Sequence, residues 1–202
     1  MGIERFWVVD DTDRPLMTAN WDTIHNKHAP LRHRAVAVLM YKTPEKQELL
    51  ISRRGEKVKY GQGKWQASAA GHVSHPFTYP EAAKAETLEE LFYNNVLPDI
   101  KFDWVGRVIH SSRTENLEIV GVFEVVYNGS VFLNHDESAE VRWKQYSELN
   151  AEIIDAQPCA NMYTKTFVNV MLAYSRWRDG DNKAILPPFS EPVLDDKPPL
   201  TF

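Results

Sequence analysis

Glu86, Glu89 and Glu90 are the residues whose types and spacing point most directly to chemistry in this sequence. Residues three and four positions apart lie on one face of an α-helix, so the three carboxylates would project together. Clustered carboxylates repel one another unless a cation joins them, and hard oxygen ligands of this kind suit Mg²⁺ or Mn²⁺. The three residues predict a divalent-cation site, and a solvated acidic helix face is the alternative interpretation.

A helix start precedes these glutamates. Thr78 and Glu81 have the spacing of a capping box, and Pro80 falls in the first turn, where its missing N–H costs nothing. We therefore expect a helix over about residues 79–94. Gly71 stands upstream of this helix, after a hydrophobic run, and favours the cation site over the acidic surface.

Residues 71–90 resemble the Nudix box. That box has a glycine, five residues, a glutamate, seven residues, then Arg-Glu-hydrophobic-any-Glu-Glu-any-Gly. Gly71 takes the place of the box glycine, Glu86 follows the arginine position, and Glu89 and Glu90 take the places of the paired metal ligands. The four departures are Phe77, Ala85, Thr87 and Phe92. In the family the arginine helps to orient the carboxylates, so its replacement by Ala85 bears on catalytic efficiency more than on fold or metal binding.

The resemblance extends over roughly residues 5–175 and points to the branch that joins hydrolases to bacterial-type isopentenyl-diphosphate isomerases. The matching segments include residues 8–11, 33–38, 49–54, 63–66, 115–124 and 140–143. The resemblance implies an α/β fold, a Nudix αβα sandwich with a mixed β-sheet. It also implies a Mg²⁺- or Mn²⁺-dependent hydrolase that cleaves the diphosphate linkage of a nucleoside or other organic diphosphate.

Catalytic and substrate-binding roles follow from the same resemblance and from charge. Metal ligation falls to Glu86, Glu89 and Glu90, and the catalytic carboxylates are Glu86, Glu90 and Glu118, with Glu86 and Glu118 as alternatives for the general base. The phosphates need positive charge, which the 52–64 loop supplies. Its candidates for substrate binding are Arg53, Arg54 and Lys64, with Lys57 and Lys59 beside them, and a solvated loop is the alternative.

Single residues decide how well the sequence matches the isomerase. In that enzyme a cysteine directly before the Gly-His pair is a catalytic acid/base, and here the position is Ala70, which cannot transfer a proton. His33 and His72 match two of its metal-binding histidines, while Asn26 falls at the spacing of the third. Structural histidines with satisfied hydrogen bonds are the alternative for this pair.

Later positions of the isomerase pattern match only in part. Glu118 fits the second member of a glutamate pair, and the first falls on Asn116 or, with a one-residue shift, on Glu115. Residues 155–158 resemble the isomerase, but Tyr163 stands where a tryptophan is expected.

Composition indicates an ordinary globular domain. The chain has 202 residues, 43% of them hydrophobic and 25% charged, which suffices for one substantial core. The net charge of −5 argues against broad nucleic-acid binding. No run reaches about 18 apolar residues, so we expect no membrane segment. The lone cysteine, Cys159, fits a reducing compartment, and we expect a cytoplasmic protein.

The pattern along the chain alternates strands and helices. We expect one Nudix domain over residues 1–182 and a proline-rich C-terminal tail over 183–202. Expected strands cover residues 5–9, 35–41, 48–53, 65–73, 102–110, 117–127 and 140–145, with a turn at 10–15. Besides the box helix, helices are expected at 23–27, 147–154 and 164–177.

Two further alternatives stay open. The first is a Nudix-fold binding or regulatory module with weakened catalysis, which the departures at Phe77, Ala85 and Phe92 favour and the retained glutamates oppose. The second concerns assembly, since the sequence leaves a homodimer open. The partner that the leading hypothesis requires is a small-molecule organic diphosphate.

Overall fold

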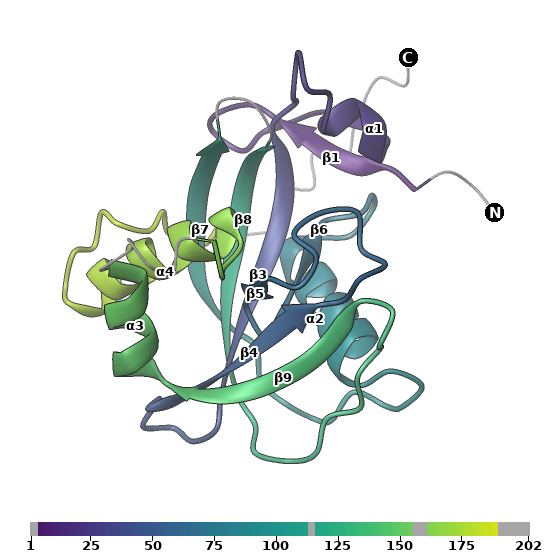
Figure 1. Ribbon diagram of the computed structural model, residues 1–202. Coiled ribbons are helices and arrows are strands. Elements are labelled where there is room, and N and C mark those ends of the chain that lie inside the picture. Colours follow the sequence, from purple (N-terminus) through teal and green to yellow (C-terminus); the bar gives the residue numbers. More distant parts are fainter. Residues whose placement is uncertain (1–3, 113–115, 155–160, 190–202) are drawn as a thin grey trace.

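A single mixed sheet organises the computed structural model, which describes residues 4–112, 116–154 and 161–189 (Figure 1). Strand β3 is its centre: it pairs in parallel with β8 and antiparallel with β1, β4 and β6. The nine strands among the described residues are β1 (Phe6–Val9), β2 (Pro15–Ala19), β3 (His33–Tyr41), β4 (Glu48–Arg54), β5 (Trp65–Gln66), β6 (Ala69–His72), β7 (Asp103–Ser112), β8 (Asn116–Val126) and β9 (Ser138–Gln145).

Helices cover both faces of this sheet. Helix α2 (Tyr79–Leu91) packs on one face, while α3 (Tyr146–Ile154) and α4 (Lys165–Arg178) pack on the other (Figure 1). A short helix, α1 (Trp21–Ile24), follows β2. The predicted α/β class and mixed sheet are therefore confirmed. None of the helices in the described part of the chain is long and apolar enough to cross a membrane.

The composition of β3 explains its central place. All nine of its residues are buried, as expected for a strand with helices on both sides. Ala35, Ala37 and Leu39 face the core under α3 and α4, whereas Val36 and Val38 face α2. This period of two is what the pleat of a strand imposes.

The structure departs from the local expectations at three points. The strand Pro15–Ala19, which follows the expected turn at 10–15, was not predicted, and the expected strand 65–73 divides into β5 and β6. Between them, Ser68 Oγ accepts from the Met40 N–H and donates to the Leu50 carbonyl, joining β3 to β4. Helix α2 ends at Leu91 rather than near 94, because Phe92 turns into the core. Its capping box is confirmed by the Thr78 N–H, which donates to Glu81 at 2.8 Å.

The described part of the tail lies against the sheet. The backbones of Leu186 and Arg107 pair in both directions, at 2.7 and 2.9 Å, and the Arg107 guanidinium donates to the Pro187 carbonyl. Ile185 is buried in the core beside α4. Residues 190–202 lie outside the described residues, and the domain boundary at 182 stays a prediction.

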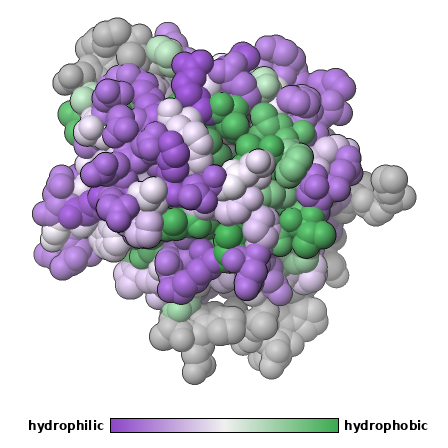
Figure 2. Space-filling view, turned by 90° about the horizontal axis from the view of Figure 1, so that it is seen from below, coloured by the Kyte–Doolittle hydropathy of each residue, from purple (hydrophilic) through white to green (hydrophobic). Residues whose placement is uncertain are grey.

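Apolar side chains gather in one patch on the face seen from below (Figure 2). Exposed apolar residues among those described include Tyr93 and Val96 after α2, and Phe132 after β8. Nothing in the structure shows what covers them, so the homodimer also stays a prediction.

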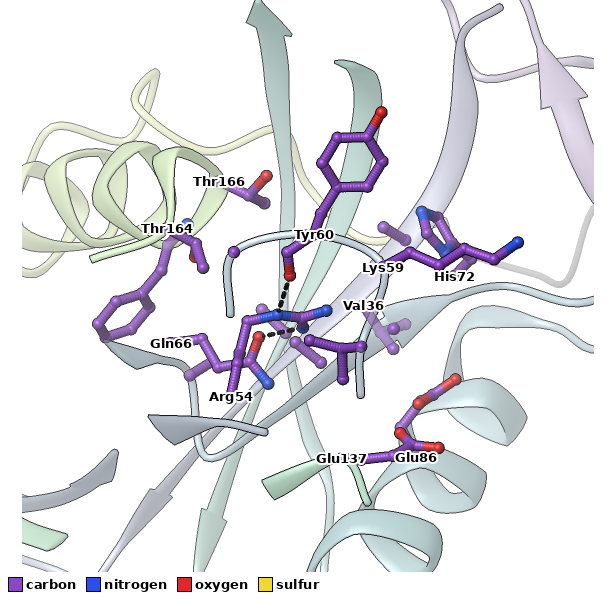
Figure 3. A pocket seen from close by; sticks show the side chains of 18 of the residues that line it. Val36, Arg54, Lys59, Tyr60, Gln66, His72, Glu86, Glu137, Thr164 and Thr166 are labelled. Atoms are coloured by element: carbon purple, nitrogen blue, oxygen red, sulfur yellow. Dashed lines mark hydrogen bonds between the residues drawn. The ribbon is translucent and has the colours of Figure 1, made fainter. Parts of the chain in front are cut away.

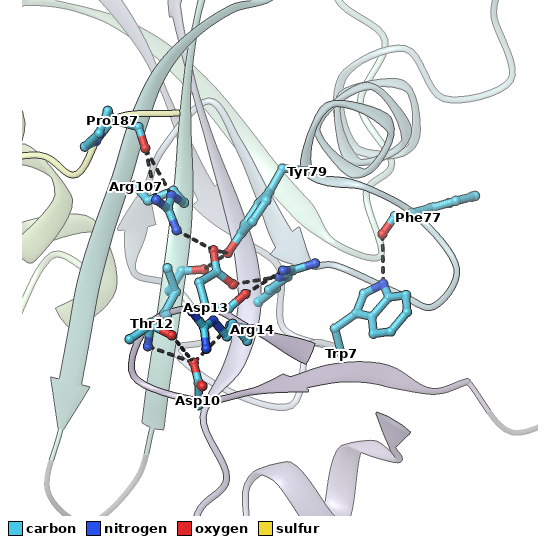
Figure 4. Close-up of polar contacts among 11 residues, drawn as sticks. Trp7, Asp10, Thr12, Asp13, Arg14, Phe77, Tyr79, Arg107 and Pro187 are labelled. Atoms are coloured by element: carbon cyan, nitrogen blue, oxygen red, sulfur yellow. Dashed lines mark hydrogen bonds and ion pairs between the residues drawn. The ribbon is translucent and has the colours of Figure 1, made fainter. Parts of the chain in front are cut away.

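Asp13 joins four elements of the fold. Its carboxylate, only 2% exposed, accepts from Arg34 on β3 at 2.7 Å, Arg107 on β7 at 2.9 Å and the Tyr79 hydroxyl on α2 at 3.0 Å (Figure 4). Asp13 sits in the turn after β1 with φ of 70°, a left-handed conformation that Asp and Asn tolerate better than most residues. A buried charge is tolerated only when paired, so Asp13 fixes the first turn of α2 against the sheet.

We predict that Asp13→Asn lowers the free energy of unfolding by about 3–5 kcal/mol, because two buried guanidinium groups lose their anion while the backbone conformation stays accessible. Urea denaturation measures this loss. Asp11→Asn is the matched control, since Asp11 pairs with Arg32 at 2.7 Å but is 88% exposed, and its loss should be under about 1 kcal/mol. Equal effects of the two substitutions would contradict a structural role for Asp13.

Candidate functional site

One cavity of about 780 Å³ contains most of the predicted site residues. The carboxylates of α2 line one part of it, and histidines from β6 and α1 line another. The loop over residues 55–64 and the start of α4 close its remaining sides (Figure 3). The structure therefore brings Glu86, Glu89, Glu90 and Glu118 to one cavity. Their positions in the sequence do not by themselves show that Glu118 joins the other three.

Gly71 on β6 leaves space that the Glu86 carboxylate of α2 occupies. A Cβ atom added at Gly71 would lie 2.2 Å from the Glu86 carboxyl carbon, so any side chain here would displace that carboxylate. Strand β6 pairs with the central β3 through Gly71 and Val36, which holds this point of contact in place. Glycine at position 71 therefore leaves room for the Glu86 carboxylate in this position.

The carboxylates of α2 lie in an environment that disfavours their charge. Burial raises the pKa of Glu90 to about 8, against the opposing effect of the Ala70 N–H and Arg54. Burial, followed by repulsion from Glu90 and Glu89, raises the pKa of Glu86 well above its usual value. Glu89 is exposed at the mouth. A divalent cation would remove this repulsion, so the donor set fits Mg²⁺ or Mn²⁺.

Glu137 is a site residue that the sequence analysis missed. It precedes β9 and lines the same cavity, and burial together with Glu89 raises its pKa. Its carbonyl accepts from the Gly55 N–H at 2.6 Å, which fixes it beside the loop. No spacing relative to the box reveals Glu137, because the pairing of β4 with β9 brings it there.

Three histidines form a second cluster. The ligand atoms of His25, His33 and His72 all lie within 4.8 Å of one another, and the Nε2 atoms of His25 and His72 are 3.2 Å apart. Asn26 stands at the spacing of the third histidine, and the structure brings the preceding residue, His25, to that place. The exposed Asn26 side chain instead accepts from the His28 N–H, and α1 begins at Trp21, which turns His25 inward.

His33 shows that this cluster fits a metal ion. Its Nδ1 lies 2.8 Å from the Leu31 carbonyl, so Nδ1 carries the proton and Nε2 is an acceptor. That Nε2 is buried without a hydrogen-bond partner among the described residues, contrary to the alternative of a satisfied structural histidine. Glu118 Oε1 lies 3.8 Å from His33 Nε2 and 3.7 Å from His72 Nε2.

The charge states of this cluster also suit a cation. Burial lowers the pKa of His33, and burial together with His33 lowers the pKa of His72 to about 3, so both imidazoles are neutral. Burial alone would raise the pKa of Glu118, but a proton on His33 or His72, and the hydrogen bonds from Asn116 and Thr166, lower it below its usual value. Glu115, residues 155–158 and Cys159 lie outside the described residues.

The predicted cations divide into two groups. Arg54, Lys57, Lys59 and Lys64 line the cavity. Arg53 does not, because the next residue of a strand faces the opposite side, and it pairs with Glu140 at 3.0 Å. Arg54 donates to the Tyr60 carbonyl at 2.8 Å and to Gln66 Oε1 at 2.6 Å (Figure 3).

Comparison with known proteins gives a family, a relative and two similar structures. The family model of the NUDIX domain matches residues 31–164. The isopentenyl-diphosphate Delta-isomerase of Brevibacterium linens is 30% identical over 161 residues, which are 78% of this chain and 85% of that protein. The crystal structure of DR0079 from Deinococcus radiodurans has a TM-score of 0.66 at 17% identity and covers 84% of this chain and 98% of that one. The C. elegans Ap4A hydrolase, at 15% identity and a TM-score of 0.51, covers 73% and 98% respectively.

We predict that the metal-free protein loses stability as the pH rises from about 5 to 8. The pKa of Glu90 is raised in the folded state to about 8 from 4.5, so the unfolded chain releases this proton first. Each pH unit in that window then costs about 1.4 kcal/mol from this one group. Urea denaturation in the presence of EDTA at several pH values measures the slope.

Glu90→Gln removes the titrating group and should flatten this dependence, while added Mn²⁺ should restore stability to the native chain at pH 8. Parallel pH profiles for the variant and the native chain would contradict the assignment to Glu90.

Proposed function

This chain belongs to the Nudix family, and we propose that it is a divalent-metal-dependent hydrolase that cleaves the diphosphate linkage of an organic diphosphate. The observation that carries the proposal is the meeting of Glu86, Glu89 and Glu90 with Arg54 and the loop lysines in one cavity. Metal-binding carboxylates beside cations are the arrangement that phosphoryl chemistry requires.

Glu86, Glu89 and Glu90 would hold Mg²⁺ or Mn²⁺ in this proposal. When bound, the ion neutralises phosphate charge and lowers the pKa of water. Lys64 and Lys59 line the same cavity and supply charge to the phosphates. Lys59 lies 4.0 Å above the Trp21 ring, which places it at the edge of the cavity beside His25.

A general base must accept a proton from the attacking water. Glu118 is ionised at neutral pH because its pKa lies below the usual value, whereas the raised pKa of Glu86 makes Glu86 the stronger base once it is deprotonated. Thr166 donates to Glu118 Oε2 at 2.8 Å and orients that carboxylate. Glu86 and Glu118 remain the alternatives for the general base, and Glu86 lies beside the other two box carboxylates.

Isomerisation of isopentenyl diphosphate is the second candidate function. The specific observation in its favour is the cluster of His25, His33 and His72 with Glu118, together with the similarity to the B. linens isomerase. The position before Gly71 opposes it, because the methyl group of Ala70 cannot transfer a proton. Tyr163 also donates to Glu152 at 2.7 Å and does not line the cavity.

We predict Mg²⁺- or Mn²⁺-dependent phosphate release from at least one compound in a panel of nucleoside and other organic diphosphates. Glu89→Gln should lower the rate by more than about 100-fold. Loss of a residue that only supports a metal ligand already lowers metal affinity or activity by about 10- to 100-fold, and Glu89 would be a ligand itself. Glu89 is exposed, so circular dichroism should show an unchanged fold. Glu148→Gln, on the exposed surface of α3, is the control that should leave the rate unchanged. Metal binding with no hydrolysis across the panel would favour the binding-module alternative.

We predict no isomerisation of isopentenyl diphosphate by the native protein, because one face of the alkene would lack an acid or base. Proton NMR in D₂O, which follows deuterium entry into the product, measures the reaction. Ala70→Cys alone should not confer it, since Asn116 and Tyr163 also depart from the isomerase pattern. Formation of the isomer at a catalytic rate would refute this prediction and favour the second candidate.

A further inference from the structure

The hydrogen bonds of Glu90 identify what replaces the arginine that α2 lacks. Its carboxylate is 2% exposed and accepts three hydrogen bonds. The Ala70 N–H donates to Oε1 at 3.2 Å, while Gln66 Nε2 at 3.3 Å and Ser138 Oγ at 3.2 Å donate to Oε2. All three donors come from strands, so the orientation of Glu90 is set by the sheet.

Gln66 can support Glu90 only in one orientation of its amide. When Glu90 is ionised, as a metal ligand is, a reversed amide would present its own oxygen to the carboxylate, and two acceptors would face each other. Arg54 Nη1 donates to Gln66 Oε1 at 2.6 Å, and a guanidinium has donors only. Arg54 therefore holds the oxygen of Gln66 on one side and directs its NH₂ group to Glu90. Gln66 itself is 3% exposed, so the reversed amide has no water to compensate it.

The same guanidinium also holds the loop over the cavity. Arg54 Nε donates to the Tyr60 carbonyl at 2.8 Å, and the Arg54 backbone pairs with Lys64 and Gly63 at 2.9 and 3.0 Å (Figure 3). Gly61, with φ of +65°, lies beside the same side chain, and an added Cβ there would be in van der Waals contact with Arg54 Cδ at 3.4 Å. The loop is thus wrapped around the side chain that orients Gln66.

We propose that Arg54 is a positioning residue that orients the box carboxylate Glu90 through Gln66, in place of the arginine absent at Ala85, and couples that orientation to the loop over residues 55–64. The inference rests on the proposed function, because it assumes that Glu90 holds a divalent ion. It assigns Arg54 to the support of the metal site, whereas the sequence suggested direct contact with substrate.

Mn²⁺ titration calorimetry without substrate tests this role. Arg54→Ala should weaken Mn²⁺ binding by about 10- to 100-fold, the usual effect of losing an outer-shell partner. Gln66→Leu should weaken it similarly, and the double variant should be no weaker than either single one, since both remove the same support. Arg142→Ala, which removes a guanidinium paired with Glu140 on neighbouring β9, is the control and should bind Mn²⁺ normally.

Restoring charge from the helix gives a second readout. Arg54→Ala combined with Ala85→Arg should recover at least half of the lost binding energy, because a guanidinium again adjoins the carboxylates. A residue that only contacts phosphate would raise KM, leave Mn²⁺ affinity intact and gain nothing from Ala85→Arg.

Each outcome decides the matter. Native Mn²⁺ affinity in Arg54→Ala, or independent additive losses in the double variant, overturns the proposal. If the native protein does not bind Mn²⁺, both the role of Arg54 and the proposed function are overturned. If it binds Mn²⁺ but hydrolyses no substrate, only the proposed function is overturned. If circular dichroism shows that Arg54→Ala is unfolded, Gln66→Leu replaces it in the test. Mn²⁺ affinity is then compared between Gln66→Leu and Gln66→Leu combined with Ala85→Arg.

Discussion

The close approach of Gly71 to Glu86 is the constraint on which the site depends. Because the Glu86 carboxylate occupies the space of a missing side chain, it lies against β6, while Glu90 on the same helix is buried. Burial and mutual repulsion raise the pKa of both groups. The fold thus holds Glu86, Glu89 and Glu90 side by side, and their mutual repulsion disfavours the charged state of the cluster. A cation is the group that satisfies this arrangement best.

Strand β6 extends this constraint to the second cluster. Consecutive residues of a strand face opposite sides, so Gly71 meets α2 while Ala70 and His72 lie on the side of α4. Three consecutive residues thereby join the carboxylate cluster and the histidine cluster in one cavity. Ala70 also donates its N–H to Glu90, while its methyl group takes the place of the reactive isomerase thiol. Within this shared framework Ala70, together with Asn116 and Tyr163, separates the two candidate chemistries.

Local signals predicted the parts of the site that one element carries. The capping box, Gly71 and the spacing of the glutamates sufficed for α2 and its carboxylates. His25 was missed because α1 has four residues and no periodicity to fix its phase. Gln66, Ser138 and Glu137 were missed because strand pairing brings them together, with Ser52 opposite Gln66 and Arg54 opposite Ser138. Arg53 and Arg54 were predicted to share a role, although strand alternation separates neighbouring side chains.

The support of α2 explains how clustered carboxylates stay in place without the helix arginine. At its first turn, Tyr79 donates to the buried Asp13, which two arginines hold against β3 and β7. At its other end, Phe92 is buried and its N–H donates to the Leu88 carbonyl. Both ends are therefore anchored to the sheet, and the carboxylates between them cannot move apart by tilting the helix. Their orientation then has to come from donors on the strands, so in this chain the cation site is a property of the sheet as much as of the box helix.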